Sequence, residues 1–190
     1  MAEELSEGYL IGQLLVAMPT MRDPRFTRSV IYLCAHNADG AMGLVLNRLV
    51  GSLTFPDLLA QLGIDRTEAG RDIRVHFGGP VDTGRGFVLH SPDYSDDGTI
   101  MIDGRVGLTA SLDILRDIAK GGGPKQSLLA LGYAGWGPGQ LDLEIQANGW
   151  LSAPADDALL FDAHLDDKWE RAIGKLGARA EQLSGEAGHA

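Results

Sequence analysis

Two glycine-rich segments hold the residues whose types and spacing suggest chemistry. One spans residues 132–141 and reads Gly-Tyr-Ala-Gly-Trp-Gly-Pro-Gly-Gln-Leu, and the other spans residues 78–81 and reads Gly-Gly-Pro-Val. Glycine permits positive φ angles and close backbone approach, so we expect two constrained loops. If the loops meet in space, their N–H groups could hold an anion. The expected ligand-binding residues are Gly78, Gly79, Gly132, Gly135, Trp136, Gly139 and Gln140, with Asn47 as a polar neighbour.

A second interpretation gives the glycines a purely architectural role. Glycine also serves tight turns, and it would let Tyr133, Trp136 and Pro80 pack closely. The phosphate-loop pattern Gly-x-x-x-x-Gly-Lys-Ser/Thr is absent from the sequence. The anion site and the tight turns therefore both remain open from the sequence.

Two histidines are the candidates for a general base or a ligand. His36 and His90 each end an apolar run that resembles a strand, so both could lie at one edge of a sheet. Cys34 would share a strand face with His36, because alternate residues of a strand face the same way. A buried thiol is the simplest interpretation of Cys34, and a nucleophile is the alternative. The histidines are dispersed and Cys34 is the single cysteine, so we expect neither a metal nor a cofactor.

Composition narrows the class of partner. The 190 residues include 16 basic and 26 acidic side chains, which gives a net charge of −10. This balance argues against non-specific binding to nucleic acids or anionic membranes, because both prefer a basic face. The dense basic cluster of Arg22, Arg25 and Arg28 is interpreted as a solvated face.

The apolar runs are too short to cross a membrane. The longest are residues 14–18, 30–35 and 128–131, well below the roughly 18–20 residues of a span. The first residues carry Glu3, Glu4 and Glu7 and lack the basic region of a signal peptide. We therefore expect a cytoplasmic protein of one domain, residues 1–190, with a core at about 8–177 and a frayed tail at 178–190.

Local patterns predict an α+β fold. Turn signals at residues 37–40 and 103–104 separate apolar runs and predict two hairpins. Strands arranged in hairpins with interspersed helices favour a mostly antiparallel or mixed sheet over strict βαβ alternation. The expected strands are residues 10–18, 29–36, 41–47, 73–77, 86–90, 99–102, 105–108, 126–133 and one from residue 150. The expected helices are residues 54–62, 111–120, 139–147, 158–161 and 166–176.

Different short motifs follow one another along most of the chain. They are Gly12-Gln-Leu-Leu-Val-Ala-Met-Pro19, Asp23-Pro-Arg-Phe-Thr-Arg-Ser-Val30, His36, Gly40-Ala-Met-Gly-Leu-Val-Leu-Asn47, Gly78-Gly-Pro-Val81, Phe87-Val-Leu-His90, Gly132-Tyr-Ala-Gly-Trp136, Gly139-Gln-Leu141, Glu144, Trp150 and Trp169. Together they resemble the YqgE/AlgH family of bacterial proteins. Leu49 departs from the pattern, where proline is expected. The resemblance implies a compact α+β fold and a bacterial cytosolic setting. It brings the label of transcriptional regulator for some members, but no set of catalytic residues.

Three functions are consistent with the sequence. The first is a non-enzymatic protein that binds a small anionic ligand or a protein partner where residues 78–81 approach residues 132–140. The second is a hydrolase for a phosphorylated or nucleotide-like substrate, with His36 or His90 as base. The third is a transcriptional regulator that acts directly on DNA, which the charge does not favour.

Overall fold

The structure, a computed structural model, describes residues 9–177 and has an α+β fold. The first five strands are β1 (Gln13–Ala17), β2 (Val30–Asn37), β3 (Gly40–Val45), β4 (Val75–Phe77) and β5 (Val81–His90). The other four are β6 (Thr99–Ile102), β7 (Val106–Thr109), β8 (Ser127–Trp136) and β9 (Trp150–Pro154). The helices are α2 (Phe55–Gln61), α3 (Leu112–Ala119), α4 (Gln140–Gln146), α5 (Asp157–Phe161) and α6 (Lys168–Gly174). The predicted frayed tail, residues 178–190, lies outside the described residues.

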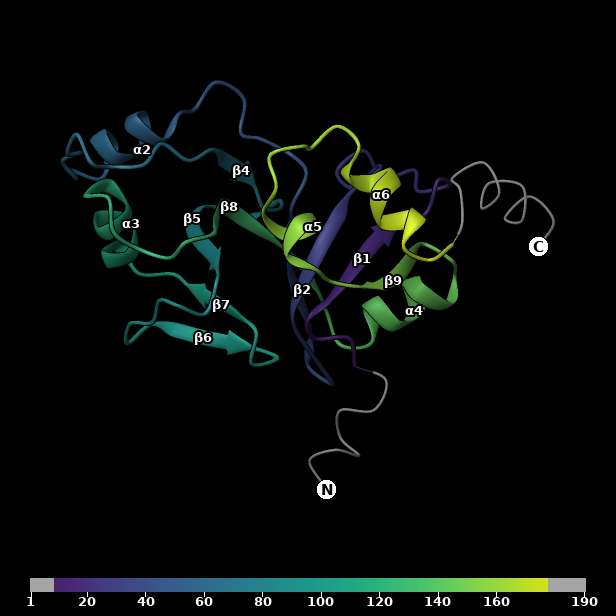
Figure 1. Cartoon of the computed structure of the whole chain (residues 1–190). Helices are drawn as coiled ribbons and strands as arrows, with labels where there is room; N and C mark the ends of the chain where they lie inside the picture. The colour runs from purple at the N-terminus through teal and green to yellow at the C-terminus, as the bar shows by residue number, and fades with distance from the viewer. Residues whose placement is uncertain (1–8, 178–190) are drawn as a thin grey trace.

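The strands form one curled sheet of nine strands in the order β6-β7-β5-β8-β3-β2-β1-β9, with β4 paired to β8 beside this path (Figure 1). Every pairing is antiparallel except β4 with β8. Both predicted hairpins, β2–β3 and β6–β7, are confirmed. Asp103 and Gly104 have φ angles of 53° and 65°, the left-handed pair that a two-residue hairpin turn requires.

Three apolar clusters cover the two faces of the sheet. An inner cluster fills the curl and joins strand residues such as Tyr32 and Leu89 to Trp169 and Ile173 of α6. On the outer face, Phe55 of α2 and Ile118 of α3 pack together at one end, which is the left end in Figure 1. At the other end, Leu141 of α4 packs on Trp136 and Trp150, and we call this third group the α4 cluster. No described helix has the length and apolar character that crossing a membrane would need.

The glycines of residues 78–79 allow one strand connection to cross another strand. β4 and β5 both pair with Leu129 of β8, so they lie on its two sides. The short connection between them must therefore pass over β8. A Cβ on Gly79 would lie 2.0 Å from the carbonyl carbon of Tyr133, and a Cβ on Gly132 would lie 2.3 Å from the carbonyl oxygen of Gly79. Only glycine permits this backbone contact.

The structure corrects the expectation that residues 132–140 form a loop. Residues 132–136 belong to β8, because Ala134, Gly135 and Trp136 pair with β3. Gly132 accommodates the bend in this strand with a φ of 75°. Glycines in a strand often mark an irregular register or a close backbone approach; here Gly132 contacts Gly79, and the register between β5 and β8 shifts beside it. Only residues 137–139 form the turn that leads into α4.

Both α2 and α3 begin after the N-cap residue that the sequence predicts, but only α2 has a side-chain cap bond. Thr54 caps α2 through a reciprocal hydrogen-bond pair with Asp57. Ser111 occupies the predicted N-cap of α3, but its hydroxyl donates to Asp96 Oδ2 over 2.6 Å and makes no cap bond. The carboxylate of a preceding loop therefore competes with the helix for this hydroxyl.

Candidate functional site

Two cavities lie beside the last residues of β8 and share Val81, Gly135 and Trp136. The larger cavity has a volume of about 730 Å³, and we call it the apolar groove. The smaller has a volume of about 420 Å³, and we call it the Glu144 cavity. Because both meet at Gly135, the end of β8 is the candidate site.

The apolar groove lies between β2, β3 and β8 on one side and the β5–β6–β7 strands on the other. Its apolar wall includes Met42, Phe87, Ile100, Leu108 and Tyr133. Ile100 is 64% exposed, so its side chain lies at the open rim. This lining suits an apolar group that is brought from outside.

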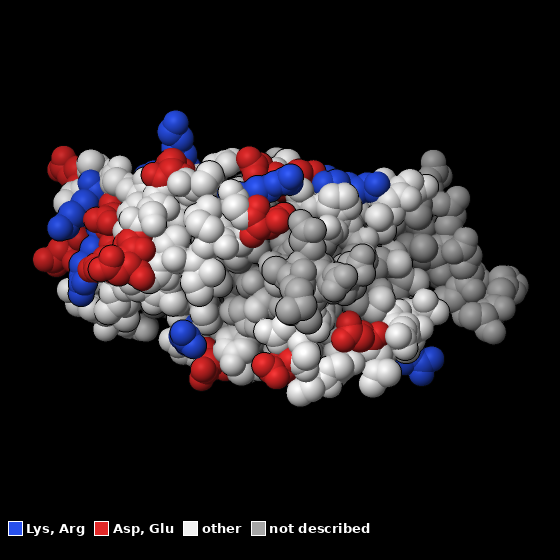
Figure 2. All heavy atoms as spheres, turned by 90° about the horizontal axis from the view of Figure 1, so that it is seen from below, with Lys and Arg blue, Asp and Glu red and all other residues white. Residues whose placement is uncertain are grey.

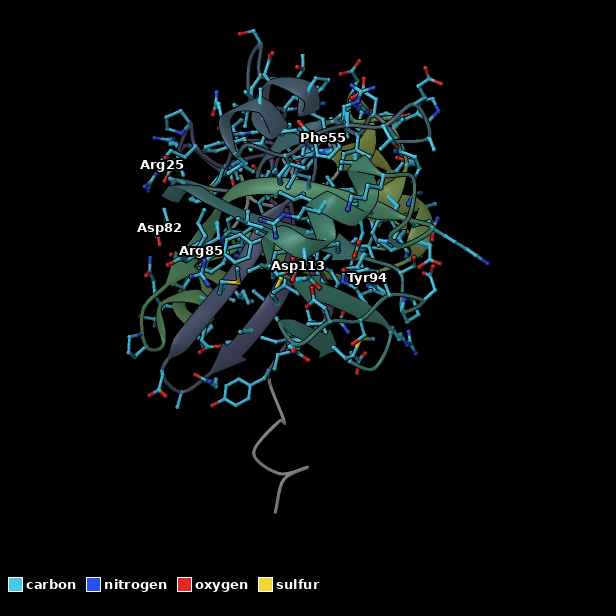
Figure 3. All side chains as sticks on the ribbon, turned by 90° about the vertical axis from the view of Figure 1, so that its left-hand side faces the viewer. Arg25, Phe55, Asp82, Arg85, Tyr94 and Asp113 are labelled. Atoms are coloured by element: carbon cyan, nitrogen blue, oxygen red, sulfur yellow. The ribbon has the colours of Figure 1, made fainter. Side chains whose placement is uncertain are left out.

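Arg85 supplies a positive charge to the apolar groove. It comes from the exposed first half of β5, and its guanidinium lies 5.0 Å from the centre of the Phe87 ring. In the described part of the chain, Arg85 forms no ion pair. Figure 3 shows Arg25, Asp82 and Arg85 along one side of the molecule. An anionic group at the rim of the groove would find its counter-charge in Arg85.

The carboxylate of Glu144 organises the second cavity. Its Oε1 accepts the indole N–H of Trp136 over 3.1 Å and that of Trp150 over 3.0 Å. Its Oε2 accepts the amide N–H of Gln140 over 2.9 Å. No basic side chain among residues 9–177 pairs with Glu144. The cavity therefore holds a partly buried carboxylate without a direct ion pair, and Arg25 of the same lining interacts with it electrostatically from farther away.

Two arginines of the predicted basic cluster already form ion pairs with carboxylates. Arg25 pairs with Asp23 over 2.7 Å, and hydrogen bonds from Arg25 hold the pKa of Asp23 below its usual value. Arg28 pairs with Glu170 over 3.0 Å and stacks on Trp169 at 4.4 Å. This pairing agrees with the interpretation of the basic cluster as a solvated face.

Cys34 and His36 do not share a face, contrary to the expectation from a regular strand. Leu33 pairs with Gly43 and Ala35 pairs with Met42, which leaves Cys34 as an extra residue in a β-bulge. Cys34 is half-buried, packs against the inner cluster and lines part of the apolar groove, and burial raises the pKa of its thiol to about 12. That protonated thiol does not suit a nucleophile.

His36 faces the opposite side, towards α4. Its Nδ1 accepts the backbone N–H of Leu10 over 3.1 Å, and its Nε2 lies 3.2 Å from Asp142 Oδ1. The ring of Tyr9 packs against it edge-on at 4.9 Å. His36 therefore joins residues 9–10 to α4, and it lines neither cavity.

His90 is fully buried at the other end of the sheet. It pairs with Ser127, the first residue of β8. His36 instead pairs with Ala41 of β3, and Ala41 pairs with Trp136 at the other end of β8. The expectation that the two histidines share one sheet edge is therefore wrong. His90 Nδ1 donates to the Ser91 carbonyl over 2.8 Å, and Nε2 lies 2.7 Å from Thr109 Oγ1.

The expected ligand residues divide into three groups. Gly135, Trp136 and Gln140 line the cavities. Gly78, Gly79 and Gly132 do meet, but in backbone contact, and Gly139 is the N-cap residue before α4, with a φ of 71°. Asn47 follows the opposite end of β3. Its amide is occupied by Val30 N–H at 3.0 Å and the Arg28 carbonyl at 2.9 Å.

The apolar groove itself was missed by the sequence reasoning. Met42, Phe87, Ile100 and Arg85 come from three strands, and each has an ordinary strand context in the sequence. Only the curl of the sheet brings them together. In the part of the chain that the structure describes, no three acidic, histidine or cysteine side chains are grouped to hold a metal.

Comparison with known proteins identifies the family. The family model described as AlgH-like matches residues 14–181. The chain belongs to this AlgH-like family. A UPF0301 protein of Rhodospirillum rubrum is 56% identical over 184 residues, covering 97% of this chain and 96% of the relative. A UPF0301 protein of Bradyrhizobium diazoefficiens is 58% identical over 193 residues, covering 97% and 90%.

Two solved structures share the fold. The solution structure of AlgH from Pseudomonas aeruginosa has a TM-score of 0.79 at 43% identity, covering 96% of this chain and 97% of that one. The crystal structure of protein DIP2367 from Corynebacterium diphtheriae has a TM-score of 0.73 at 23% identity, covering 92% and 91%. The resemblance to the YqgE/AlgH family and its α+β fold is thus confirmed.

Proposed function

We propose that this member of the AlgH-like family is a non-enzymatic bacterial cytosolic protein that binds a protein partner at the end of β8. The observation that carries the proposal is the apolar groove of about 730 Å³, whose rim exposes Ile100 and Val81. Concave surfaces with an apolar lining and a few charged groups are typical of binding sites. A regulatory role would then follow from the partner rather than from chemistry at the site.

A protein partner fits the groove better than a bare inorganic anion. Arg25 is neutralised by Asp23, and Glu144 places a negative charge in the adjoining cavity. The backbone of residues 78–79 is packed against β8 rather than turned to solvent. An apolar side chain of a partner, by contrast, would gain free energy in proportion to the area it buries in the groove.

Arg85 favours a second candidate, a small ligand with an apolar body and one anionic group. The body would occupy the groove and the anion would pair with the guanidinium. An anilinonaphthalene sulfonate dye has this composition and serves as the probe. We expect its fluorescence to rise on binding the native protein and its affinity to fall in Arg85→Gln.

The hydrolase and DNA hypotheses receive less support. Neither His36 nor His90 lines either cavity, so neither of the two predicted bases lies beside the groove. Two of the clustered arginines are paired with carboxylates. On the face shown in Figure 2, basic and acidic side chains alternate along the margins rather than gathering into a basic stripe. Direct DNA binding would need such a stripe.

Panning a displayed library of random linear peptides tests the proposal. Selected peptides are then measured against the wild-type protein, Val81→Glu and Leu143→Glu. Val81 is 38% exposed and lies in both cavities, whereas Leu143 is 67% exposed on α4 and lines neither. We expect about a tenfold loss of affinity in Val81→Glu and little change in Leu143→Glu. Equal binding to all three proteins, or no enrichment, would overturn the proposal.

A further inference from the structure

The end of β8 has a strand partner on only one side. On the β3 side, pairing continues through Gly135 to Trp136. On the β5 side, the ladder ends where Val81 pairs with Tyr133. Pro80, which precedes Val81, has no N–H to extend the ladder. Among residues 9–177, no strand pairs with Gly135 on that side.

The backbone groups of Gly135 point to this open side. A Cβ on Gly40 would lie 2.3 Å from the carbonyl oxygen of Trp136, so that oxygen faces β3. In an antiparallel ladder, hydrogen-bonded and non-bonded pairs alternate. The N–H and C=O of Gly135 therefore face away from β3, and they present one donor and one acceptor to an incoming chain.

The two cavities lie on the two faces of that edge. Tyr133 packs on the inner cluster, on the side of the apolar groove. Ala134 and Trp136 belong to the α4 cluster, on the side of the Glu144 cavity. Successive side chains of a strand point to opposite faces. A strand added beside Gly135 would thus place one side chain in the groove and the next in the Glu144 cavity.

The charges decide which side chain each cavity accepts. The lining of the groove is mostly apolar, with Asp39 and Arg85 as its charged residues, so it suits a residue such as leucine, isoleucine or valine. The second cavity is lined by the carboxylates of Asp23 and Glu144 and by the guanidinium of Arg25, which pairs with Asp23 and also interacts electrostatically with Glu144, so the lining keeps a net negative charge that attracts a cation. Lysine or arginine at the neighbouring position meets this requirement, and the net charge of −10 favours approach of a basic segment.

We propose that the partner docks as an extended segment that adds a strand at Gly135, with an apolar side chain in the groove and an adjacent basic side chain in the Glu144 cavity. The inference rests on the proposed function, since it uses the same groove. It goes further by specifying the conformation and chemistry of the bound segment. Main-chain hydrogen bonds give affinity in this mode, and the alternating pockets give specificity.

Peptides enriched from the random library test the inference through their pattern and their backbone. We expect an apolar residue directly beside a lysine or arginine. In an antiparallel added strand, N-methylation of the apolar residue removes the N–H that pairs with the Gly135 carbonyl and should weaken binding about tenfold. N-methylation of the adjacent basic residue, whose N–H points away from β8, is the matched control and should leave affinity nearly unchanged.

Substitution of Glu144 tests the second cavity. Glu144→Gln retains one oxygen for the two indole N–H groups and removes the charge. We expect the affinity of basic peptides to fall about tenfold in this variant and to depend less on salt.

The outcomes separate the two proposals. Peptides that lose affinity in Val81→Glu but show helical spacing of their apolar residues, or tolerate both N-methyl groups, would overturn strand addition and leave the groove as the partner site. Peptides that bind Val81→Glu with the same affinity as the wild-type protein would overturn the proposed function itself. If basic peptides keep their affinity for Glu144→Gln, the proposed basic side chain in the Glu144 cavity would be overturned.

Discussion

Trp136 donates its indole N–H to the carboxylate of Glu144 over 3.1 Å, and this bond joins the end of β8 to α4. Trp136 and Trp150 are both buried, and both use the same carboxylate oxygen. Glu144→Ala leaves two buried donors without an acceptor, so we expect a loss of about 2–4 kcal/mol in the free energy of unfolding. Glu144→Gln keeps the oxygen and should lose less. Urea unfolding measures both, and equal losses would contradict this role for Glu144.

A backbone crossing makes Gly79 intolerant of a side chain. Its φ is 155° and a Cβ there would overlap Tyr133 at 2.0 Å. We expect Gly79→Ala to lose more than about 4 kcal/mol, or to fail to fold. A Cβ on Gly84 would have no heavy atom within 4 Å, so Gly84→Ala should change stability by less than about 0.5 kcal/mol. Similar thermal midpoints for the two variants would show that the crossing is looser than described.

Burial of His76 makes stability depend on pH. Burial lowers the pKa of His76 from 6.5 to about 4, and its Nδ1–H donates to the Leu129 carbonyl over 3.1 Å. Between pH 6.5 and 4 the unfolded chain binds a proton that the native state does not, so the free energy of unfolding falls with falling pH. The expected loss is about 3 kcal/mol.

His76→Asn isolates this contribution. The variant keeps an N–H donor and removes the titrating group, so its stability should vary less over the same pH window. The Asp96 and Asp162 carboxyls have pKa values below 3.8 because of hydrogen bonds from Ser111 and Arg171, respectively, and they act at lower pH. An unchanged pH profile would contradict the assignment to His76.

The thiol of Cys34 should react slowly in the folded protein. Burial raises its pKa to about 12, and it is the single cysteine of the chain. Since the thiolate is the reactive form, iodoacetamide at neutral pH should alkylate the native protein far more slowly than the urea-unfolded protein. Mass spectrometry follows both reactions. Comparable rates would show that the thiol is accessible and ionised.

Local features of the fold were predictable from the sequence. The hairpin at residues 103–104 follows from Asp-Gly between apolar runs, and the start of α2 follows from Thr54 and Asp57. These signals act between neighbours in the chain. The bulge at Cys34 has no such signal, because the pairing of β2 with β3 decides it. One extra residue there places Cys34 and His36 on opposite faces of the sheet.

Glycine content misled the sequence reasoning about β8. Four glycines among residues 132–139 suggest a loop, yet residues 132–136 form a strand. Glycines occur in this strand because the backbones of β3 and of the crossing residues 78–79 approach the backbone of β8 closely. The sequence left open whether the two glycine segments meet, and in the structure they meet through direct backbone contact. The groove depends on sheet curvature, which brings Arg85 and Met42 from distant strands to one cavity. Single-sequence patterns do not encode that curvature.

An amide NMR titration of the isotope-labelled protein with a peptide selected from the random library tests most directly whether a partner binds at the end of β8. We expect the largest shift changes at Val81, Arg85, Gly135 and Trp136, which line the apolar groove; all of them except Arg85 also line the Glu144 cavity. Shift changes centred elsewhere, for example around Leu112 and Leu115 of α3, with those residues unaffected, would contradict it.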